Sequence, residues 1–223
     1  MKQSGLKKLG FLAITSGIAF SSKAAVVINE IDYDQPGTDT AEFIELFNSG
    51  ESDASLQNYS IDLINGSNST SYRNIDLSGF SISASGYFVI CGDASLVANC
   101  DYSFTTTSGW MQNGAPDAVA LYDNGSLMDS VSYEGEIQPY QEGSILAFAD
   151  SNTDIASLSR IPDGFDGDDN GLDFQSGCIT PGTTNIAGIG DCSATHVSAV
   201  PVPAAAWLFA SGILGLTGLA RRK

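Results

Sequence analysis

Residues 118–133, AVALYDNGSLMDSVSY, predict the fold class of this chain. Short β-prone runs lie on both sides of Asn124-Gly125, which is the pattern of two strands joined by a turn. Asn and Gly accept the positive φ angles that a two-residue hairpin turn requires. We therefore expect a tight hairpin of strands 118–123 and 126–133, with Tyr122 opposite Leu127 and Leu121 opposite Met128.

Much of the chain between residues 25 and 192 has the same character. Short β-prone runs are separated by clusters of Gly, Asn, Asp and Ser, and no long stretch has helical periodicity. This pattern predicts an all-β sandwich. The strands expected outside the hairpin are 26–32, 41–48, 59–65, 72–77, 87–91, 145–148 and 157–161.

The segment AEFIELFN, residues 41–48, is expected to be a central strand. Alternation places Phe43 and Phe47 on one face and Ile44 and Leu46 on the other, so both faces should be covered. Glu45 shares the face of the two phenylalanines. Because burying a lone carboxylate is costly, Glu45 must be hydrogen-bonded, paired, or near the sheet edge.

The charge of the chain is concentrated between residues 25 and 203. That stretch contains all 26 acidic residues but only two basic ones, Arg73 and Arg160, so its formal charge is −24. Such a surface repels phosphate backbones, so we expect no binding to nucleic acid. It is compatible with attraction of cations and with a solvated surface adapted to salty water.

The two ends of the chain are typical of an exported protein. Residues 1–24 resemble a secretory signal, with Lys2, Lys7 and Lys8 before an apolar run and Ser22-Lys23-Ala24 at the cleavage site. Residues 193–203 are predicted to be a linker. Residues 204–220 are predicted to be a marginal transmembrane helix, and 221–223 a basic cytoplasmic end. At 17 residues the apolar run is short for a bilayer.

Four cysteines lie beyond the signal, at Cys91, Cys100, Cys178 and Cys192. An even number in an exported chain favours two disulfides over metal ligation. Of the three possible pairings, Cys91 with Cys100 and Cys178 with Cys192 are favoured, because each closes a short loop of turn-forming residues.

Several stretches of the body resemble the lamin tail domain family, which has an immunoglobulin-like β-sandwich fold. The resemblance covers most of residues 25–185 and implies a domain at 25–192 that serves as an interaction module. NGAPDAVAL with SYEG is similar to the version that precedes the catalytic domain of extracellular bacterial nucleases. The matching stretches are VVINEIDYDQPGTDTAEFIELFN (26–48), LQNYSIDLINGSN (56–68), MQNGAPDAVALYDNGSLMDSVSYEG (111–135), SLSRIPDGFDGDDNGLDFQSG (157–177) and TPGTTN (180–185).

The C-terminal region resembles a PEP-CTERM sorting signal of the VPxPA type. Its motif is Val200, Pro201, Val202, Pro203 and Ala204, followed by the apolar run and Arg221-Arg222-Lys223. Val202 stands where leucine is common, and a Pro-Glu-Pro triplet is absent. The resemblance implies a Gram-negative bacterium and an exosortase-type membrane protease that cuts near Pro203. A permanent anchor and a core helix are the competing interpretations of this run.

The sequence contains no recognisable catalytic motif, so we expect no enzymatic activity. The single histidine, His196, lies in the predicted linker, where it is poorly placed to act as a base. Carboxylate pairs such as Glu42 with Glu45 and Glu134 with Glu136 are frequent by chance in so acidic a chain.

The stretch DGDDNG suggests a calcium loop. Asp166, Asp168, Asn170 and Gly171 match the first half of D-x-[DN]-x-[DN]-G, and Asp173 supplies a late ligand. The twelfth position is Gly177 instead of Glu, and the alternative is a turn in which Asp and Asn bond to their own backbone. A weaker candidate for Ca²⁺ comprises Asp32, Asp34, Asp39 and Glu42.

These features together predict an exported binding or structural module at the cell surface or in the extracellular matrix. Its expected partners are the sorting protease and an unidentified extracellular protein or polysaccharide. The alternatives are an accessory protein of an extracellular hydrolase or nuclease, and a calcium-dependent adhesin.

Overall fold

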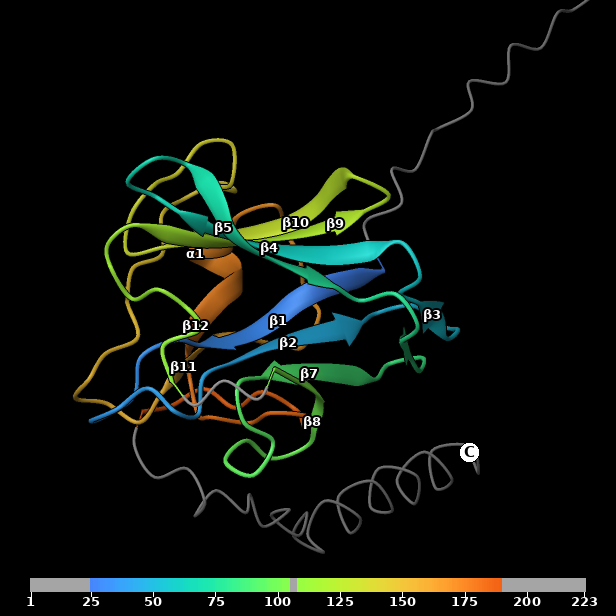
Figure 1. Ribbon diagram of the computed structural model, residues 1–223, viewed down its shortest axis with the longest axis horizontal. Coiled ribbons are helices and arrows are strands. Elements are labelled where there is room, and N and C mark those ends of the chain that lie inside the picture. The colour runs from blue at the N-terminus through green and yellow to red at the C-terminus, as the bar shows by residue number, and fades with distance from the viewer. Residues whose placement is uncertain (1–24, 105–107, 190–223) are drawn as a thin grey trace, which may run out of the picture.

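The predicted hairpin lies at one side of the smaller of two stacked β-sheets (Figure 1) in the computed structural model, which describes residues 25–104 and 108–189. It consists of β9 (Asp117–Asp123) and β10 (Ser126–Tyr133). The φ angles of Asn124 and Gly125 are 49° and 77°, as the turn requires. Leu127 lies opposite Tyr122, which confirms the first predicted pair.

The second predicted pair, Leu121 with Met128, is wrong. The register shifts between Leu127 and Asp129, so that Asp129 lies opposite Leu121. Such a bulge adds one residue to one strand and bends it. Here it accompanies a contact with the other sheet, because Asp129 Oδ2 accepts a hydrogen bond of 2.7 Å from the backbone N–H of Ile28.

The strands form two sheets and one short two-stranded ribbon. The smaller sheet has the order β10-β9-β4-β5, the larger one β12-β11-β1-β2-β7-β8, and the ribbon pairs β3 with β6. The other elements are β1 (Val26–Asp32), β2 (Phe43–Asn48), β3 (Ala54–Ser55), β4 (Tyr59–Asn65), β5 (Thr70–Asp76), β6 (Ser81–Ile82), β7 (Tyr87–Cys91), β8 (Cys100–Ser103), β11 (Ser157–Arg160), α1 (Asn170–Asp173) and β12 (Phe174–Gly177).

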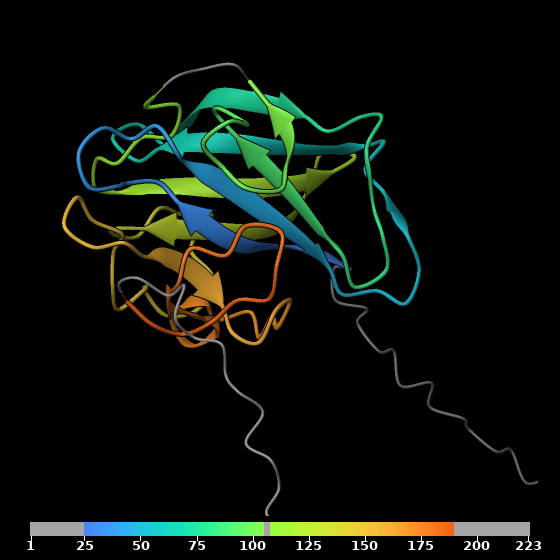
Figure 2. The same cartoon turned by 90° about the horizontal axis from the view of Figure 1, so that it is seen from below.

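The apolar core lies between the two sheets. Ile28, Ile44 and Ile90 from the larger sheet pack in one cluster with Leu63 and Val119 from the smaller sheet. The view in Figure 2, turned by 90°, shows the two layers and the orange strands near the C-terminal end beside the blue β1. The expected all-β, two-sheet sandwich is therefore confirmed.

The predicted strands agree with this architecture except at one segment. Residues 145–148 form no strand, because Leu146 packs into the core from an irregular loop while Ile145 stays 53% exposed. Sequence patterns also missed β3, β6, β8 and β12, each of which has two to four residues. Strands of this length are too short for a recognisable alternation of apolar and polar residues.

Residues 178–189, which we call the strap, follow β12 and lie across the outer face of the larger sheet. Backbone hydrogen bonds connect the strap to itself and to β12, from Cys178 N to Ile186 O (2.8 Å) and from Gly188 N to Ser176 O (3.2 Å). The strap bonds to Glu30 of β1 and Glu45 of β2, while Val97 from the loop after β7 packs on Phe43, so β2 is largely buried on both faces as expected for a central strand. This polar cover explains how carboxylates occur inside the molecule.

Within the described ranges, no helix is both long and apolar enough to cross a membrane. The expected signal at 1–24, the linker, the sorting motif and the apolar run at 204–220 all lie outside those ranges.

Candidate functional site

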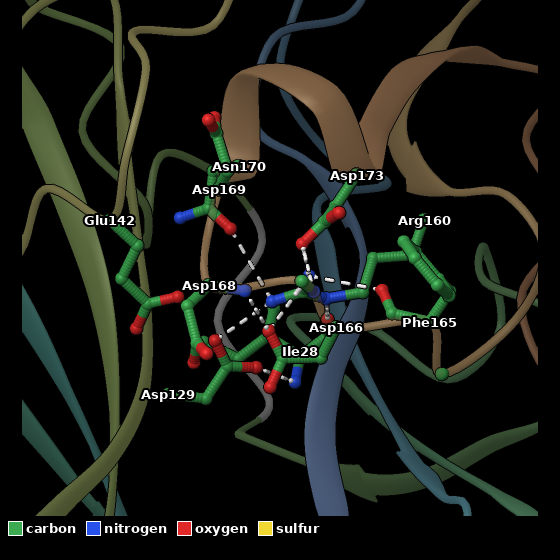
Figure 3. Close-up of polar contacts among 12 residues, drawn as sticks. Ile28, Asp129, Glu142, Arg160, Phe165, Asp166, Asp168, Asp169, Asn170 and Asp173 are labelled. Atoms are coloured by element: carbon green, nitrogen blue, oxygen red, sulfur yellow. Dashed lines mark hydrogen bonds and ion pairs between the residues drawn. The ribbon is translucent and has the colours of Figure 1, made fainter. Parts of the chain in front are cut away.

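The guanidinium of Arg160 is the centre of a buried polar network in the described chain (Figure 3). Arg160 is fully buried at the end of β11. Its Nη2 lies 2.9 Å from Asp129 Oδ1, and its Nη1 lies 3.1 Å from Asp173 Oδ2 and 3.6 Å from Asp166 Oδ1. The guanidinium also lies over the ring of Phe174, with Cζ 4.5 Å from the ring centroid.

Backbone oxygens complete the contacts of Arg160. Nε donates to Ile28 O at 2.8 Å, and Nη1 donates to Phe165 O at 3.2 Å. A guanidinium has five N–H donors in a rigid plane and needs many acceptors when it is buried. Burial raises the pKa of Asp129, while the charge of Arg160 opposes that shift. The network therefore joins β1, β10 and β11 to the loop before α1.

This network includes three of the four residues of the candidate calcium loop. Asp166 and Asp173 face Arg160, and Asn170 Oδ1 accepts a bond of 3.4 Å from its Nη2. Asp168 has a φ of 56°, and its N–H donates to Asp166 Oδ1 at 3.1 Å, as in an Asx turn. Within residues 25–104 and 108–189, no group of three or more His, Cys, Asp or Glu side chains is arranged to hold a metal ion.

In the sequence, Arg160 was the residue that could have indicated this ion-pair network. It is one of only two basic residues in a body with 26 acidic ones, and the Asp-rich loop follows it within six residues. Aspartates near a lone arginine are as consistent with an internal ion pair as with a metal site. Only the fold brings Asp129, 31 residues away, to the same guanidinium.

Two buried glutamates hold the strap against the larger sheet. Glu30 accepts bonds from Thr180 N at 2.9 Å and from Ser157 Oγ at 2.6 Å. Glu45 accepts from Gly182 N at 2.6 Å and from Asn29 Nδ2 at 2.7 Å. Removal from water raises the pKa of Glu30 to about 7 and that of Glu45 to about 8. Of the three alternatives expected for Glu45, the structure shows the first, a hydrogen-bonded carboxylate.

A pocket of about 230 Å³ opens between the strap, the loop after β7 and the end of β1. Its walls are mainly apolar and come from segments far apart in the sequence. The lining residues are Asp32, Gln35, Ala41, Phe43, Leu96, Val97, Ala98, Ile179 and Pro181.

Asp32 is the one ionisable residue among those that line the pocket, and none of its surface is exposed. Its Oδ1 accepts a bond of 2.5 Å from Gln35 Nε2, whereas its Oδ2 is buried and has no hydrogen-bond donor in the described structure. The pKa of Asp32 is raised well above its usual range, first by burial and then by the nearby charge of Asp150. A buried oxygen without a donor is rare in folded proteins.

The disulfide between Cys91 and Cys100 shapes one wall of this pocket. The pairing is confirmed, and it closes the loop that presents Leu96 and Val97. Cys178 is also disulfide-bonded. Its expected partner, Cys192, lies outside the described residues, so that pairing stays a prediction.

The residues of the weaker calcium candidate have different hydrogen-bond partners. Glu42 accepts bonds from Trp110 N at 2.9 Å and Met111 N at 3.1 Å, and so fixes the loop before β9. Asp39 accepts from Gln35 N at 3.1 Å. The structure therefore does not gather Asp32, Asp34, Asp39 and Glu42 around one point.

The members of the two carboxylate pairs considered for catalysis also bind different partners. Glu42 binds the 110–111 backbone, whereas Glu45 binds the strap. Glu134 accepts from Tyr33 Oη at 3.1 Å, and Glu136 accepts from Gln138 Nε2 at 2.7 Å. His196 lies outside the described residues.

The arrangement defines the class of this protein as a two-sheet β-sandwich domain, with a buried ion-pair network and a small pocket at one end. A sequence model of the Lamin Tail Domain family matches residues 19–135, more than half of the 223-residue chain. The chain therefore belongs to the lamin tail domain family. No curated protein matches the sequence.

Proposed function

We propose that this protein is a non-catalytic binding module that acts at the cell surface or in the extracellular matrix of a Gram-negative bacterium. The observation that carries the proposal is the combination of a lamin tail domain with a side-chain-sized pocket on a rigid sandwich. The polar side chains of this domain mostly bond to one another and to the backbone, as in the Arg160 network. Side chains that are bonded in this way stabilise the fold and its binding surface, which favours a binding module over an enzyme.

Export and sorting are part of the same proposal. Residues 1–24 direct the chain out of the cytoplasm, and the motif from Val200 to Ala204 is recognised by an exosortase-type protease. Cutting near Pro203 then frees the domain from the inner membrane. The disulfide between Cys91 and Cys100 supports this route, because disulfides persist in oxidising compartments outside the cytoplasm.

Intact mass spectrometry of extracellular and membrane fractions tests the route. We expect an extracellular species that has lost residues 1–24 and everything after about residue 203. A membrane-bound species that still ends at Lys223, and that is unchanged when the sorting protease is deleted, would make the tail a permanent anchor.

A pull-down from extracellular matrix tests the binding function. The full-length protein is immobilised, and an equally acidic, unrelated exported domain is the control for charge. We expect saturable capture of a matrix component by this protein alone. Equal capture by both proteins would reduce the effect to net charge, and co-purification of nuclease activity would favour the alternative of a hydrolase accessory protein.

A further inference from the structure

The buried oxygen of Asp32 indicates what chemistry the pocket is built to receive. Asp32 lies at the end of β1 directly opposite Phe43 on β2, so both side chains point to the outer face of the larger sheet. Phe43 and Asp32 both line the pocket. Asp32 Oδ2 accepts no hydrogen bond from the described residues, although the side chain has no exposed surface. Since the neighbouring side chain, Asp150, is a second carboxyl and not an N–H or O–H donor, this oxygen needs either a proton or a cation.

The walls of the pocket are suited to an aliphatic chain. Leu96 and Ile179 stand at the rim with 53% and 37% of their surface exposed, and Val97 and Phe43 lie deeper with 5% and 0%. Because Cys91 and Cys100 are joined, the loop that carries Leu96 is held in place before any ligand arrives. A volume of about 230 Å³ is below the ~300–1,000 Å³ of sites for drug-sized ligands, so the pocket suits a smaller group.

The negative charge of the protein favours a ligand with a positively charged group at the end of its chain. Residues 25–203 carry a formal charge of −24 and contain no lysine, so the chain itself offers no ammonium within its body. We propose that the pocket binds a lysine side chain of a partner protein, with the ammonium at Asp32 and the methylenes against Leu96, Val97 and Phe43. This inference rests on the proposed binding function and names the chemistry of the partner.

Other cations fit the pocket less well. Ca²⁺ requires six to eight oxygen ligands, whereas the lining offers one carboxylate and one amide among apolar groups. An arginine would bury a planar fork of five donors against that same small set of acceptors. An amino sugar would place hydroxyl groups against Leu96 and Phe43. A lysine needs few acceptors and brings an apolar stem.

The neighbouring Asp150 explains how the empty pocket tolerates Asp32. The two carboxyl groups lie within hydrogen-bonding reach, and Asp150 also accepts bonds from Tyr33 N at 3.0 Å and Ser151 N at 2.9 Å. A proton held between Asp32 and Asp150 can satisfy both groups in the empty protein. A bound ammonium stabilises the ionised form of Asp32 and so competes with that proton, and the titrations below are therefore made at pH 8.

The test is an NMR titration of the full-length protein with n-butylammonium as a mimic of the lysine side chain. Methylammonium removes the stem, n-butanol removes the charge, and glucosamine and Ca²⁺ represent the competing ligands. We expect saturable shifts of the amide signals of Gln35 and Leu96 with n-butylammonium. Loss of the stem should weaken binding by ~10-fold or more, because three methylenes no longer leave water.

Two variants and two controls locate the site. Asp32→Asn keeps the shape and resembles the protonated carboxyl, so the fold should persist while affinity falls ~10-fold or more. Leu96→Asn changes only the half-exposed rim and should also weaken binding. Glu51→Gln removes one exposed charge and Leu172→Asn one exposed apolar side chain elsewhere, and both should bind as the wild type does.

Four results would each overturn the inference. They are no saturable binding of n-butylammonium, equal binding by wild type and Asp32→Asn, binding of glucosamine as tightly as n-butylammonium, and preferential binding of Ca²⁺ that depends on Asp32. The pull-down separates this inference from the proposed function. Matrix capture that survives in Asp32→Asn would leave the function standing without the pocket, whereas n-butylammonium binding without matrix capture would leave the pocket standing without the function.

Discussion

At the scale of single residues, Arg160 stabilises the fold because three carboxylates depend on it. The guanidinium replaces the water that Asp129 and Asp173 lose on burial, and its own hydration is replaced by their oxygens and by backbone carbonyls. Whether such a buried pair is better than an apolar replacement varies among proteins, but removing one partner leaves an unpaired buried charge.

The Arg160→Met variant should therefore be strongly destabilised. We expect the free energy of unfolding to fall by about 3–5 kcal/mol, since Asp129 and Asp173 lose their counter-charge in the interior. Urea unfolding followed by tryptophan fluorescence measures it. The matched control is Arg73→Met on β5, which removes a cation–π contact with Phe104 and should lose only about 1 kcal/mol. Equal losses in the two variants would contradict this account of Arg160.

Calcium should have no specific effect at the Asp166–Asp173 loop, because Arg160 already supplies the positive charge there. We expect millimolar Ca²⁺ to raise the melting temperature of wild type and Asp168→Ala by the same amount, through screening of the acidic surface. Melting curves with Ca²⁺ and with NaCl at matched ionic strength provide the comparison. A Ca²⁺ response that Asp168→Ala abolishes would restore the calcium loop hypothesis.

At the scale of structural elements, short irregular segments hold the sheets in place. The loop between β7 and β8 is closed by Cys91 and Cys100, and the strap is held by hydrogen bonds to Glu30 and Glu45. Neither segment has a regular backbone pattern of its own. Each depends on covalent or polar contacts with the larger sheet.

Replacing Cys91 and Cys100 together by alanine should lower the free energy of unfolding by about 2–4 kcal/mol, as for other short disulfide loops. The expected effect arises mainly in the unfolded chain, which gains freedom when the loop is opened. Chemical unfolding of the double variant against wild type measures it. The single variants are unsuitable because each would leave one thiol free. A double variant as stable as wild type would show that packing alone fixes this loop.

At the scale of the whole molecule, the protein combines a highly acidic surface with carboxyl groups whose pKa values are raised by burial. Burial raises the pKa to about 7 for Glu30, Glu42 and Glu142 and to about 8 for Glu45, from a usual value of 4.5. The folded protein therefore holds protons that the unfolded chain has released. Stability must fall as pH rises through this range.

We expect the free energy of unfolding to be highest near pH 5 and to decrease continuously up to about pH 8. Each carboxyl that stays protonated only in the folded state contributes a slope of about −1.4 kcal/mol per pH unit between its two pKa values. Above about pH 8 the slope should flatten. Urea unfolding at half-unit steps of pH measures the profile.

The Glu45→Gln variant tests the origin of this slope. Its amide can still accept the bond from Gly182 but cannot ionise, so the decrease in stability between pH 5 and 8 should be smaller than in wild type. The matched control is Glu51→Gln at an exposed position, which should leave the profile unchanged. A pH profile that is flat in wild type would refute the proposed protonation of the interior.

The sequence by itself determined the β class, the hairpin at Asn124-Gly125, the central position of 43–48 and the disulfide between Cys91 and Cys100. These depend on local alternation, on turn residues and on short loops, all of which can be read along the chain. Only the tertiary structure decided the register shift at Asp129, the role of the Asp166–Asp173 loop around Arg160, and the pocket between β1, the disulfide loop and the strap. The physical reason is distance along the chain. Hydrogen bonds and pocket walls join residues that are far apart in the sequence, 150 positions for Glu30 and Thr180, and no local pattern records which of many acidic side chains will meet a particular partner.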